Sequence, residues 1–328
     1  MKIDRTILAF GLAAAIIAGC GGTQNGGVTP IKSAQTRPHG GSWILPEAKG
    51  EALVYVSSFV DNVYVFSYPE LKEVGDLKGA GGFGLCSDKN GNVFIPSYYE
   101  GAKIIEYAHG GSSPIATLPD SGDGYPFACS VDPTTGNLAV TNQFGSGSCG
   151  DSVAVYENAQ GTPTTYCAAP IIGYIWFCGY DNAGNLFVDG NEGSDEGPFV
   201  LAELPSRGNG LTAISVSQKF NEPGQVQWNG SNITVEDDLY TKIYAFQISG
   251  SSAQVIQTTT LKGVKKARQS WIQGSKILVP FGTSSGITKL GVWRYPAGGN
   301  ASAQVKHVGR RLAGVTVSVA PTASRIRK

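Results

Sequence analysis

The chain has 328 residues, and its 25 Lys plus Arg balance 25 Asp plus Glu, so the formal net charge is zero. That balance argues against a nucleic-acid-binding protein, which normally carries a basic excess. Glycine is abundant at 45 residues and 41% of the chain is hydrophobic, a composition that disfavours both a helical and a disordered protein and favours an all-β one.

Residues 1–19 have the features of a signal peptide. A weakly positive start precedes an apolar run from Thr6 to Ile17, which is too short to span a membrane comfortably. The run ends in Ile-Ala-Gly-Cys20, which resembles the lipobox of bacterial lipoprotein precursors. The resemblance implies cleavage before Cys20 and lipidation of its sulfur, including a palmitate; the alternative is an ordinary signal peptide with an incidental cysteine. Gly21, in place of the aspartate that commonly retains lipoproteins at the inner membrane, favours the outer membrane or the cell surface.

Residues 20–42 are rich in Gly, Thr, Gln, Pro and Ser, a composition typical of a flexible tether. We therefore expect a lipid-anchored protein of the cell envelope whose folded part spans residues 43–321. The last residues, 322–328, form a basic tail that we expect to be solvated.

A repeat runs through the folded part. The phrases DKNGNVFI (88–95), DPTTGNLAV (132–140) and DNAGNLFV (181–188) are variants of one pattern, with weaker copies at 228–235 and 272–279. Asp, Asn and Gly in these phrases suit a tight turn between two strands. A second phrase, a short alternating run followed by a Gly/Pro/Ser turn, occurs six times and is typical of a hairpin. Its copies begin at Asn62, Lys103, Ser152, Pro198, Lys242 and Lys289.

Units of about 45 residues with four short strands each, here named a to d in chain order, predict a β-propeller. Residues 51–57 have the pattern of a b strand with no a strand before it, and residues 314–320 have the pattern of an a strand with no b strand after it. We expect this last strand to complete the first blade and close the ring. The count then gives six blades: 51–79 plus 313–320, 80–119, 120–168, 169–214, 215–262 and 263–310.

The phrase DKNGNVFIPSYYEGAKIIEY resembles the NHL repeat. The resemblance covers about 270 residues and implies a six-bladed propeller like those of uncharacterised bacterial lipoproteins, with a general fold shared by gluconolactonase-like enzymes. Pro96, Ser97 and Ala102 depart from the usual pattern between strands b and c. The resemblance is specific for architecture and says little about activity.

In such a ring the b–c and d–a loops gather on one face, where binding sites usually lie. These loops include residues 262–269 and 309–313. Aromatic residues recur in them and are candidates for a partly exposed rim that holds a protein, peptide or glycan ligand, although packing between blades is the alternative. The candidates are Phe59, Phe83, Tyr98, Tyr99, Tyr125, Phe144, Tyr174, Trp176, Phe220 and Phe281.

Acidic residues concentrate on two neighbouring b–c loops, and oxygen ligands of this kind suit Ca²⁺. The metal candidates are Asn142, Asp189, Glu236 and Asp237, with solvated loop carboxylates as the alternative. Gluconolactonase-like enzymes hold a divalent metal with Glu, Asn and Asp, but their ligands do not map onto this chain one by one. We expect no other cofactor.

Nucleophilic catalysis finds little support. The three histidines lie in the tether, in a c–d turn and on an outer strand, away from the expected channel. Gly282–Gly286 fits G-x-S-x-G, but it lies between strands with no partner histidine. We therefore predict no catalytic residues of this kind.

Five cysteines remain beyond Cys20. Cys149 and Cys167 lie at the same end of one hairpin, and an exported protein permits a bridge between them. Cys86, Cys129 and Cys178 occupy equivalent positions on successive a strands. We expect them to pack as small apolar side chains, or one neighbouring pair to be bridged where its Cα atoms lie within about 7 Å.

Three functions remain open. The first is a monomeric, membrane-anchored binding module whose loop face holds a protein, peptide or glycan. The second is a calcium-dependent, lactonase-like hydrolase, and the third is a structural platform in the cell envelope.

Overall fold

The computed structural model describes residues 40–97, 101–120, 124–239, 241–283 and 286–321. Cys20, the predicted signal peptide, Tyr98, Tyr99 and the predicted basic tail lie outside these residues. The chain divides into two units, Met1–Pro38 and His39–Lys328, and the described residues all belong to the second. None of the helices that they form is long and apolar enough to span a membrane.

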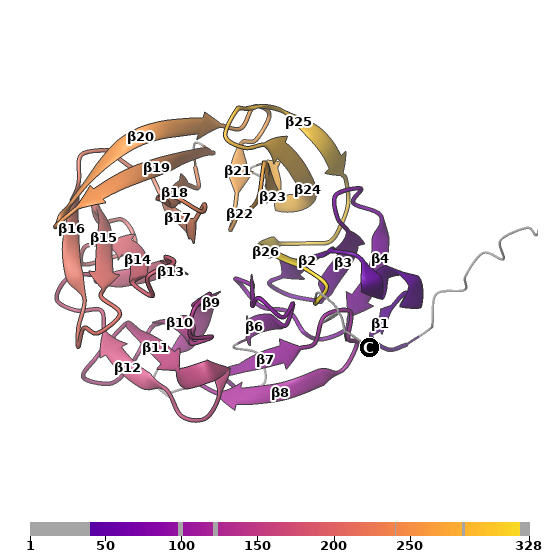
Figure 1. Ribbon diagram of the computed structural model, residues 1–328, viewed down its shortest axis with the longest axis horizontal. Coiled ribbons are helices and arrows are strands. Elements are labelled where there is room, and N and C mark those ends of the chain that lie inside the picture. Colours follow the sequence, from indigo (N-terminus) through magenta and orange to yellow (C-terminus); the bar gives the residue numbers. More distant parts are fainter. Residues whose placement is uncertain (1–39, 98–100, 121–123, 240, 284–285, 322–328) are drawn as a thin grey trace, which may run out of the picture. The chain divides into compact units, whose positions relative to one another are not determined.

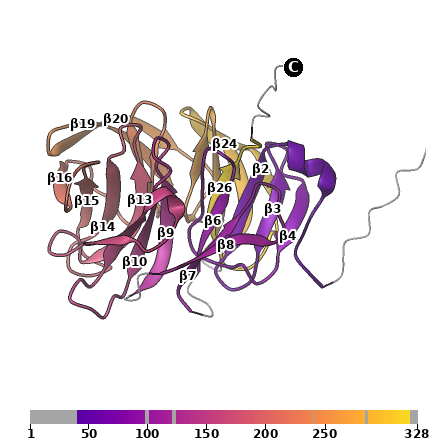
Figure 2. The same ribbon diagram turned by 60° about the horizontal axis from the view of Figure 1, so that its bottom comes forward.

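The second unit is almost entirely β-structure. Its described residues form five hydrogen-bonded sheets and two short 3-10 helices, η1 (Pro46–Gly50) and η2 (Glu157–Ala159). Figure 1 shows the sheets arranged around a common centre, and Figure 2 shows the same sheets with their strands standing side by side. The expectation of an all-β, propeller-like protein is confirmed.

The first sheet joins the two ends of this unit. Its order is β1 (Trp43–Ile44), β4 (Glu73–Leu77), β3 (Val63–Ser67), β2 (Leu53–Ser58) and β26 (Leu312–Ser318). Leu53 lies opposite Ser318 in the β2–β26 pair, so the predicted pairing of the last strand with the first b strand is confirmed. The sequence did not predict β1, which pairs along the outer strand β4 and covers its edge.

Two further sheets have four strands in chain order. One contains β5 (Cys86–Ser87), β6 (Val93–Ser97), β7 (Lys103–Tyr107) and β8 (Pro114–Pro119). The other contains β9 (Tyr125–Val131), β10 (Leu138–Gln143), β11 (Ser152–Tyr156) and β12 (Thr164–Cys167).

The next sheet has eight strands because two four-stranded runs meet at their outer edges. The first run is β13 (Tyr174–Tyr180), β14 (Leu186–Asn191), β15 (Phe199–Leu204) and β16 (Thr212–Val216). The second is β17 (Pro223–Trp228), β18 (Ile233–Asp237), β19 (Lys242–Ser249) and β20 (Ser252–Thr260). β16 and β20 pair in parallel, with Ser215 opposite Ser252. Separate four-stranded units were expected here, and edge pairing between their d strands joins them.

In the last sheet the inner strand is broken. β21 (Lys266–Ala267) and β22 (Trp271–Gln273) both pair with β23 (Lys276–Thr283), which is followed by β24 (Gly286–Arg294) and β25 (Gly298–Val305). The break places Gln269, which is fully buried, outside the strand pairing. Its side-chain amide donates to the backbone carbonyl of Leu85 and accepts from the backbone N–H of Leu85, both at 2.8 Å, and also accepts from the N–H of Val315. Gln269 thereby ties the last sheet to the start of the second.

The innermost strands form a closed circuit of contacts. β26 contacts β5, and contact then passes through β9, β13, β17 and β22 back to β26. Strands near this circuit are covered on both faces, which explains why all six residues of β2 are buried. The apolar runs of the b strands therefore serve packing between sheets.

The repeated Asp-x-x-Gly-Asn turns have a conformational role. Asp88 Oδ1 accepts hydrogen bonds from the backbone N–H groups of Asn90 and Asn92, at 2.9 and 2.7 Å. Asp181 Oδ1 does the same in its own turn, and Gly91 and Gly184 adopt φ values of 84° and 80°. These positions therefore need Asp to bond the turn and Gly to accept positive φ.

Two disulfides cross-link the unit. Cys149 and Cys167 are bonded, with Cα atoms 4.9 Å apart, as the hairpin pattern indicates. Cys86 on β5 is bonded to Cys129 on β9, with Cα atoms 5.6 Å apart, so a bridge joins two neighbouring inner strands. Cys178, the third member of that series, is a buried thiol.

Candidate functional site

Two adjoining hollows lie on the face where a strands begin and b strands end. We call the first the aromatic hollow; its volume is about 470 Å³. It is lined by Phe59, Phe83, Tyr125, Pro126, Phe127, Gln143, Phe144, Tyr174, Trp176 and Arg268. Seven of these ten residues carry aromatic rings, so the hollow is predominantly apolar.

The rings form one continuous chain of contacts. Phe59 contacts Phe83 at 4.3 Å between ring centroids, and Phe83 contacts Phe127 at 4.4 Å. The chain continues from Phe127 through Trp176, Tyr174 and Phe144 to Tyr125, with centroid distances between 5.3 and 5.9 Å. Phe127 is buried at the base, whereas Phe144 and Tyr125 are 59% and 52% exposed at the rim. Large exposed rings at the edge of a hollow are typical of a binding surface.

Asp151 fixes the rim. One of its carboxylate oxygens accepts a hydrogen bond from the backbone N–H of Phe144 and the other from that of Ile175, both at 2.8 Å. Burial nevertheless raises the pKa of the Asp151 carboxyl, and these two hydrogen bonds oppose the rise. The carboxylate thus joins the loop after β10 to the start of β13 and holds Phe144 beside Tyr174.

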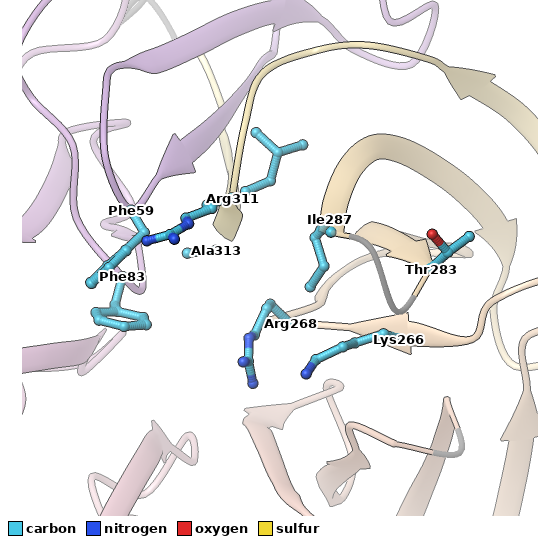
Figure 3. Close-up of a pocket in the computed structure, with 10 residues that line it drawn as sticks. Phe59, Phe83, Lys266, Arg268, Thr283, Ile287, Arg311 and Ala313 are labelled. Atoms are coloured by element: carbon cyan, nitrogen blue, oxygen red, sulfur yellow. The ribbon is translucent and has the colours of Figure 1, made fainter.

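The second hollow, which we call the basic hollow, has a volume of about 350 Å³ and shares Phe59, Phe83 and Arg268 with the first. Figure 3 shows the Lys266 and Arg268 side chains extending from the broken inner strand into the opening. The remaining lining residues are Thr283, Gly286, Ile287, Arg311, Leu312 and Ala313. Among the described residues that line either hollow there is no acidic side chain.

Arg268 lies where the two hollows meet. Its Nη1 donates a 3.0 Å hydrogen bond to Asp238, whose side chain is almost fully buried. Burial raises the pKa of Asp238 to about 7, although the Arg268 charge opposes that rise. Asp238 therefore anchors one end of the guanidinium while Arg268 remains about a quarter exposed, at 27%.

The predicted aromatic rim is partly assembled here. Of the predicted ligand-face residues, Phe59, Tyr125, Phe144 and Tyr174 line the aromatic hollow, as do Phe83 and Trp176.

Two other predicted face residues lie elsewhere. Phe220 stacks on Phe199, with ring centroids 3.9 Å apart. Phe281 is buried on β23 against Trp293, with ring centroids 5.3 Å apart. Neither lines either of the two hollows, because packing against rings of nearby strands takes up both.

The metal candidates are buried polar groups and not solvated loop carboxylates. Asp189 accepts a 2.8 Å hydrogen bond from the backbone N–H of Phe177, and Glu236 a 3.0 Å one from that of Ser270. Asp237 accepts a 3.0 Å bond from the side chain of Asn221. Each of these carboxylates, and Asn142 as well, has at least one buried polar atom without a hydrogen-bond partner among the described residues.

The arrangement of these residues bears on whether they fit a cation. The described residues contain no group of three or more His, Cys, Asp or Glu side chains that is arranged to hold a metal ion. The unpartnered oxygens of Asp189 and Glu236 are the observations that still favour a cation site.

Burial dominates the protonation of these groups. It raises the pKa values of Asp189 and Glu236 well above their usual range, and the nearby charge of Asp238 adds to both rises. Hydrogen bonds from Phe177 and Gly224 oppose the rise for Asp189, and those from Ser270 oppose it for Glu236. Asp189 on β14 thus bonds Gly224 on β17, and Glu236 on β18 bonds Ser270 between β21 and β22. Each carboxyl therefore links its own strand to the inner strand that follows in the ring.

The cations of the site were not among the residues predicted from the sequence. Lys266, Arg268 and Arg311 all fall in the loops that were assigned to this face, so their clustered charges at 265–268 and 310–311 were the available signal. Phe127 was also missed, because it lies within a strand and not within a loop.

Comparison with known proteins supports the fold. No protein-family model matches the sequence, and neither does any curated protein. The structure is similar to a chain in the crystal structure of a nidogen/laminin complex, with a TM-score of 0.63 and 13% identity over 83% of this chain and 99% of that one. It is also similar to a functionally unknown protein from Desulfotomaculum acetoxidans DSM 771, with a TM-score of 0.54 and 13% identity over 85% of this chain and 89% of that one.

At such low identity these similarities show the fold alone. The chain is an all-β protein whose sheets have a propeller-like arrangement. Function in such a fold has to be argued from the particular site, which here is the pair of hollows.

Proposed function

We propose that this protein is a binding module whose loop face, built around the aromatic and basic hollows, captures a partner in the cell envelope. The observation that carries the proposal is the chain of seven contacting rings that ends in two strongly exposed ones, Phe144 and Tyr125. Ordering a partner against rings already held by Asp151 costs little further conformational entropy on the protein side. The resemblance to a chain in a nidogen/laminin complex adds support, since that structure is an assembly of proteins.

A capture experiment tests the proposal. The tagged full-length chain is used to isolate envelope proteins quantitatively, and the variant Phe144→Ser/Tyr125→Ser is compared with wild type. Ile115→Ser/Ile256→Ser is the matched control, because Ile115 and Ile256 are equally exposed, at 56% and 52%, and line neither hollow. We expect one partner to be lost from the first variant and retained by the control. Equal capture by both variants would contradict the proposal.

We further propose that the ring has six blades of NHL type. The closed circuit of β26, β5, β9, β13, β17 and β22 supports six inner strands, and the eight-stranded sheet is then two blades joined by β16 and β20. A crystal structure with a different number of inner strands would contradict this count.

We propose that the module is tethered to the membrane as a monomer through lipid on Cys20. The lipobox-like sequence and the composition of residues 20–42 support this. Labelling with radioactive palmitate should mark wild type but not Cys20→Ser. Labelling of the variant would refute the assignment of the anchor.

A second candidate function is a calcium-dependent hydrolase. The unpartnered buried oxygens of Asp189, Glu236 and Asp237, together with Asn142, support it. If it is correct, calorimetric titration with Ca²⁺ will show heat of binding and the thermal midpoint will rise. A titration with no heat and no thermal shift would remove this candidate.

A further inference from the structure

The aromatic hollow offers few polar partners to a ligand. Two of its seven rings carry a hydroxyl, on Tyr125 and Tyr174, and besides the rings and Pro126 its lining contains Gln143 and Arg268. Gln143 is buried, and its amide nitrogen donates to the backbone carbonyl of Ile175. A sugar ring needs hydrogen-bond partners for several hydroxyl groups, so this surface suits an apolar or aromatic side chain better than a glycan.

The basic hollow supplies charge next to that apolar surface. Lys266, Arg268 and Arg311 line it, and the one carboxylate described in contact with them is Asp238, below Arg268. Because burial raises the pKa of Asp238 to about 7, this carboxyl is only partly ionised at neutral pH, and the three cations outweigh it. An anionic group is therefore the complementary ligand for this hollow.

Arg268 is suited to bind a carboxylate. Among the described residues its guanidinium makes one hydrogen bond, from Nη1 to Asp238. A guanidinium carries five N–H donors in a planar fork, which matches the two oxygens of a carboxylate. Asp238 holds the side chain in place, so little of its rotamer freedom remains to be lost on binding.

We propose that the two hollows together bind an acidic peptide segment of a partner protein, with an aromatic or large apolar side chain in the aromatic hollow and a neighbouring carboxylate on Arg268. The inference rests on the proposed function and names the chemistry of the ligand. Because the hollows share Phe59, Phe83 and Arg268, side chains two positions apart on one face of an extended peptide reach both. Lys266 and Arg311 supply the surrounding positive field.

The test compares two sets of peptides. The purified full-length chain is applied to an array of six-residue peptides in which an aromatic residue or Leu stands two positions before Asp or Glu, and to a matched array with Asn or Gln in place of the acid. The tightest binders are then measured by calorimetry. We expect the acidic peptides to bind at least about tenfold more tightly than their amide counterparts, and to weaken as salt is raised.

Variants separate the two hollows. Lys266→Gln/Arg311→Asn should weaken the acidic peptides about tenfold and leave the amide peptides unchanged, because both cations lie at the surface and Asn tolerates the φ of 48° at position 311. Arg268→Gln should remove the preference for acid entirely. Lys89→Gln, at an exposed turn position outside both hollows, matches the single charge lost in Arg268→Gln and should change nothing.

The outcomes distinguish this inference from the proposed function. If both peptide sets bind equally and Phe144→Ser/Tyr125→Ser abolishes binding, the face binds a partner but the acidic specificity is wrong. A second outcome is that neither peptide set binds, while the Ile115→Ser/Ile256→Ser control still captures an envelope partner that the Phe144→Ser/Tyr125→Ser variant loses. In that case the ligand is not a linear acidic peptide, and the inference fails while the proposed function stands. Binding of laurate in place of the peptides would also overturn the inference, in favour of a lipid carboxylate.

Discussion

The two sides of the inner ring are held together by different chemistry. On one side Cys86 and Cys129 join β5 to β9 covalently, and the hydroxyl of Thr141 donates a 2.8 Å hydrogen bond to the backbone of Trp176 on the next inner strand. On the other side the buried carboxyls of Asp189 and Glu236 make the equivalent links. The first side has no titrating group in these links, whereas the second depends on protonation.

The comparison teaches that the buried links of Asp189 and Glu236 should make one side of the ring sensitive to pH, whereas on the other side a carboxyl with a raised pKa, that of Asp151, lies at the rim. A carboxyl whose pKa is higher in the folded chain binds its proton more tightly when folded. Its contribution to stability is therefore full below the unfolded value and is lost as the pH rises through the folded value. For Asp238 that window runs from 3.8 to about 7, and for Asp189 and Glu236 the folded pKa is also raised. The protein should thus be more stable in mild acid than in mild base.

Removing the inter-strand disulfide should have the largest effect on stability. The bond between Cys86 and Cys129 closes a loop of 43 residues. Loop-closure entropy predicts that Cys86→Ala/Cys129→Ala loses about 4 kcal/mol of unfolding free energy. Chemical denaturation of wild type and variant, both kept oxidised, measures the difference. A loss below about 1 kcal/mol would mean that this side of the ring does not depend on its covalent link.

Thr141→Val should have an intermediate effect that does not vary with pH. The substitution keeps the shape of the side chain but removes the hydroxyl that accepts from the N–H of Ala128 and donates to the carbonyl of Trp176. Leaving these groups unpaired in the interior should cost about 1–3 kcal/mol. Chemical denaturation at about pH 5 and at about pH 8 should give the same loss of unfolding free energy. A loss that differs between the two pH values would contradict the proposed difference between the two sides of the ring.

Glu236→Gln should flatten the pH dependence. Glutamine retains an oxygen to accept from the Ser270 N–H but has no proton to lose, so the variant should lose less stability than wild type between about pH 5 and about pH 8. We expect the fall in thermal midpoint over that range to be smaller by at least about 2 °C. Parallel midpoint curves for the two proteins would show that Glu236 does not titrate there.

The rim substitutions should have the smallest effect on stability. Phe144 and Tyr125 are more than half exposed, so Phe144→Ser/Tyr125→Ser should change the unfolding free energy by less than about 0.5 kcal/mol while partner capture is lost. Thermal unfolding in the absence of partner checks this. A large destabilisation would indicate that the rim serves the fold and not binding.

Much of the architecture could be predicted because the repeat is strong. The Asp-x-x-Gly-Asn turns, the alternating hairpins and the unmatched strands at 51–57 and 314–320 together imply circular closure, and β2 and β26 do pair. The edge pairing of β16 with β20 and the added strand β1 could not be foreseen, because no sequence pattern specifies which outer edges meet.

The site was predictable only in part. Rings in loops were recognised as rim candidates, but whether a ring such as Phe281 packs inward depends on contacts made by distant strands. The acidic loop residues were expected to face a metal or solvent, whereas burial turned Asp189 and Glu236 into links between inner strands. The cations around Arg268 come from loops more than 40 residues apart, so only the closed ring brings them together.

Site-specific photo-crosslinking tests most directly the claim that the loop face binds the partner. Benzoylphenylalanine is placed at Phe144 in one form of the full-length chain and at Ile115 in another, two positions with similar exposure, 59% and 56%. We predict that irradiation of cells links the partner to position 144 and not to position 115. A product of equal yield from both positions, or from position 115 alone, would contradict the account.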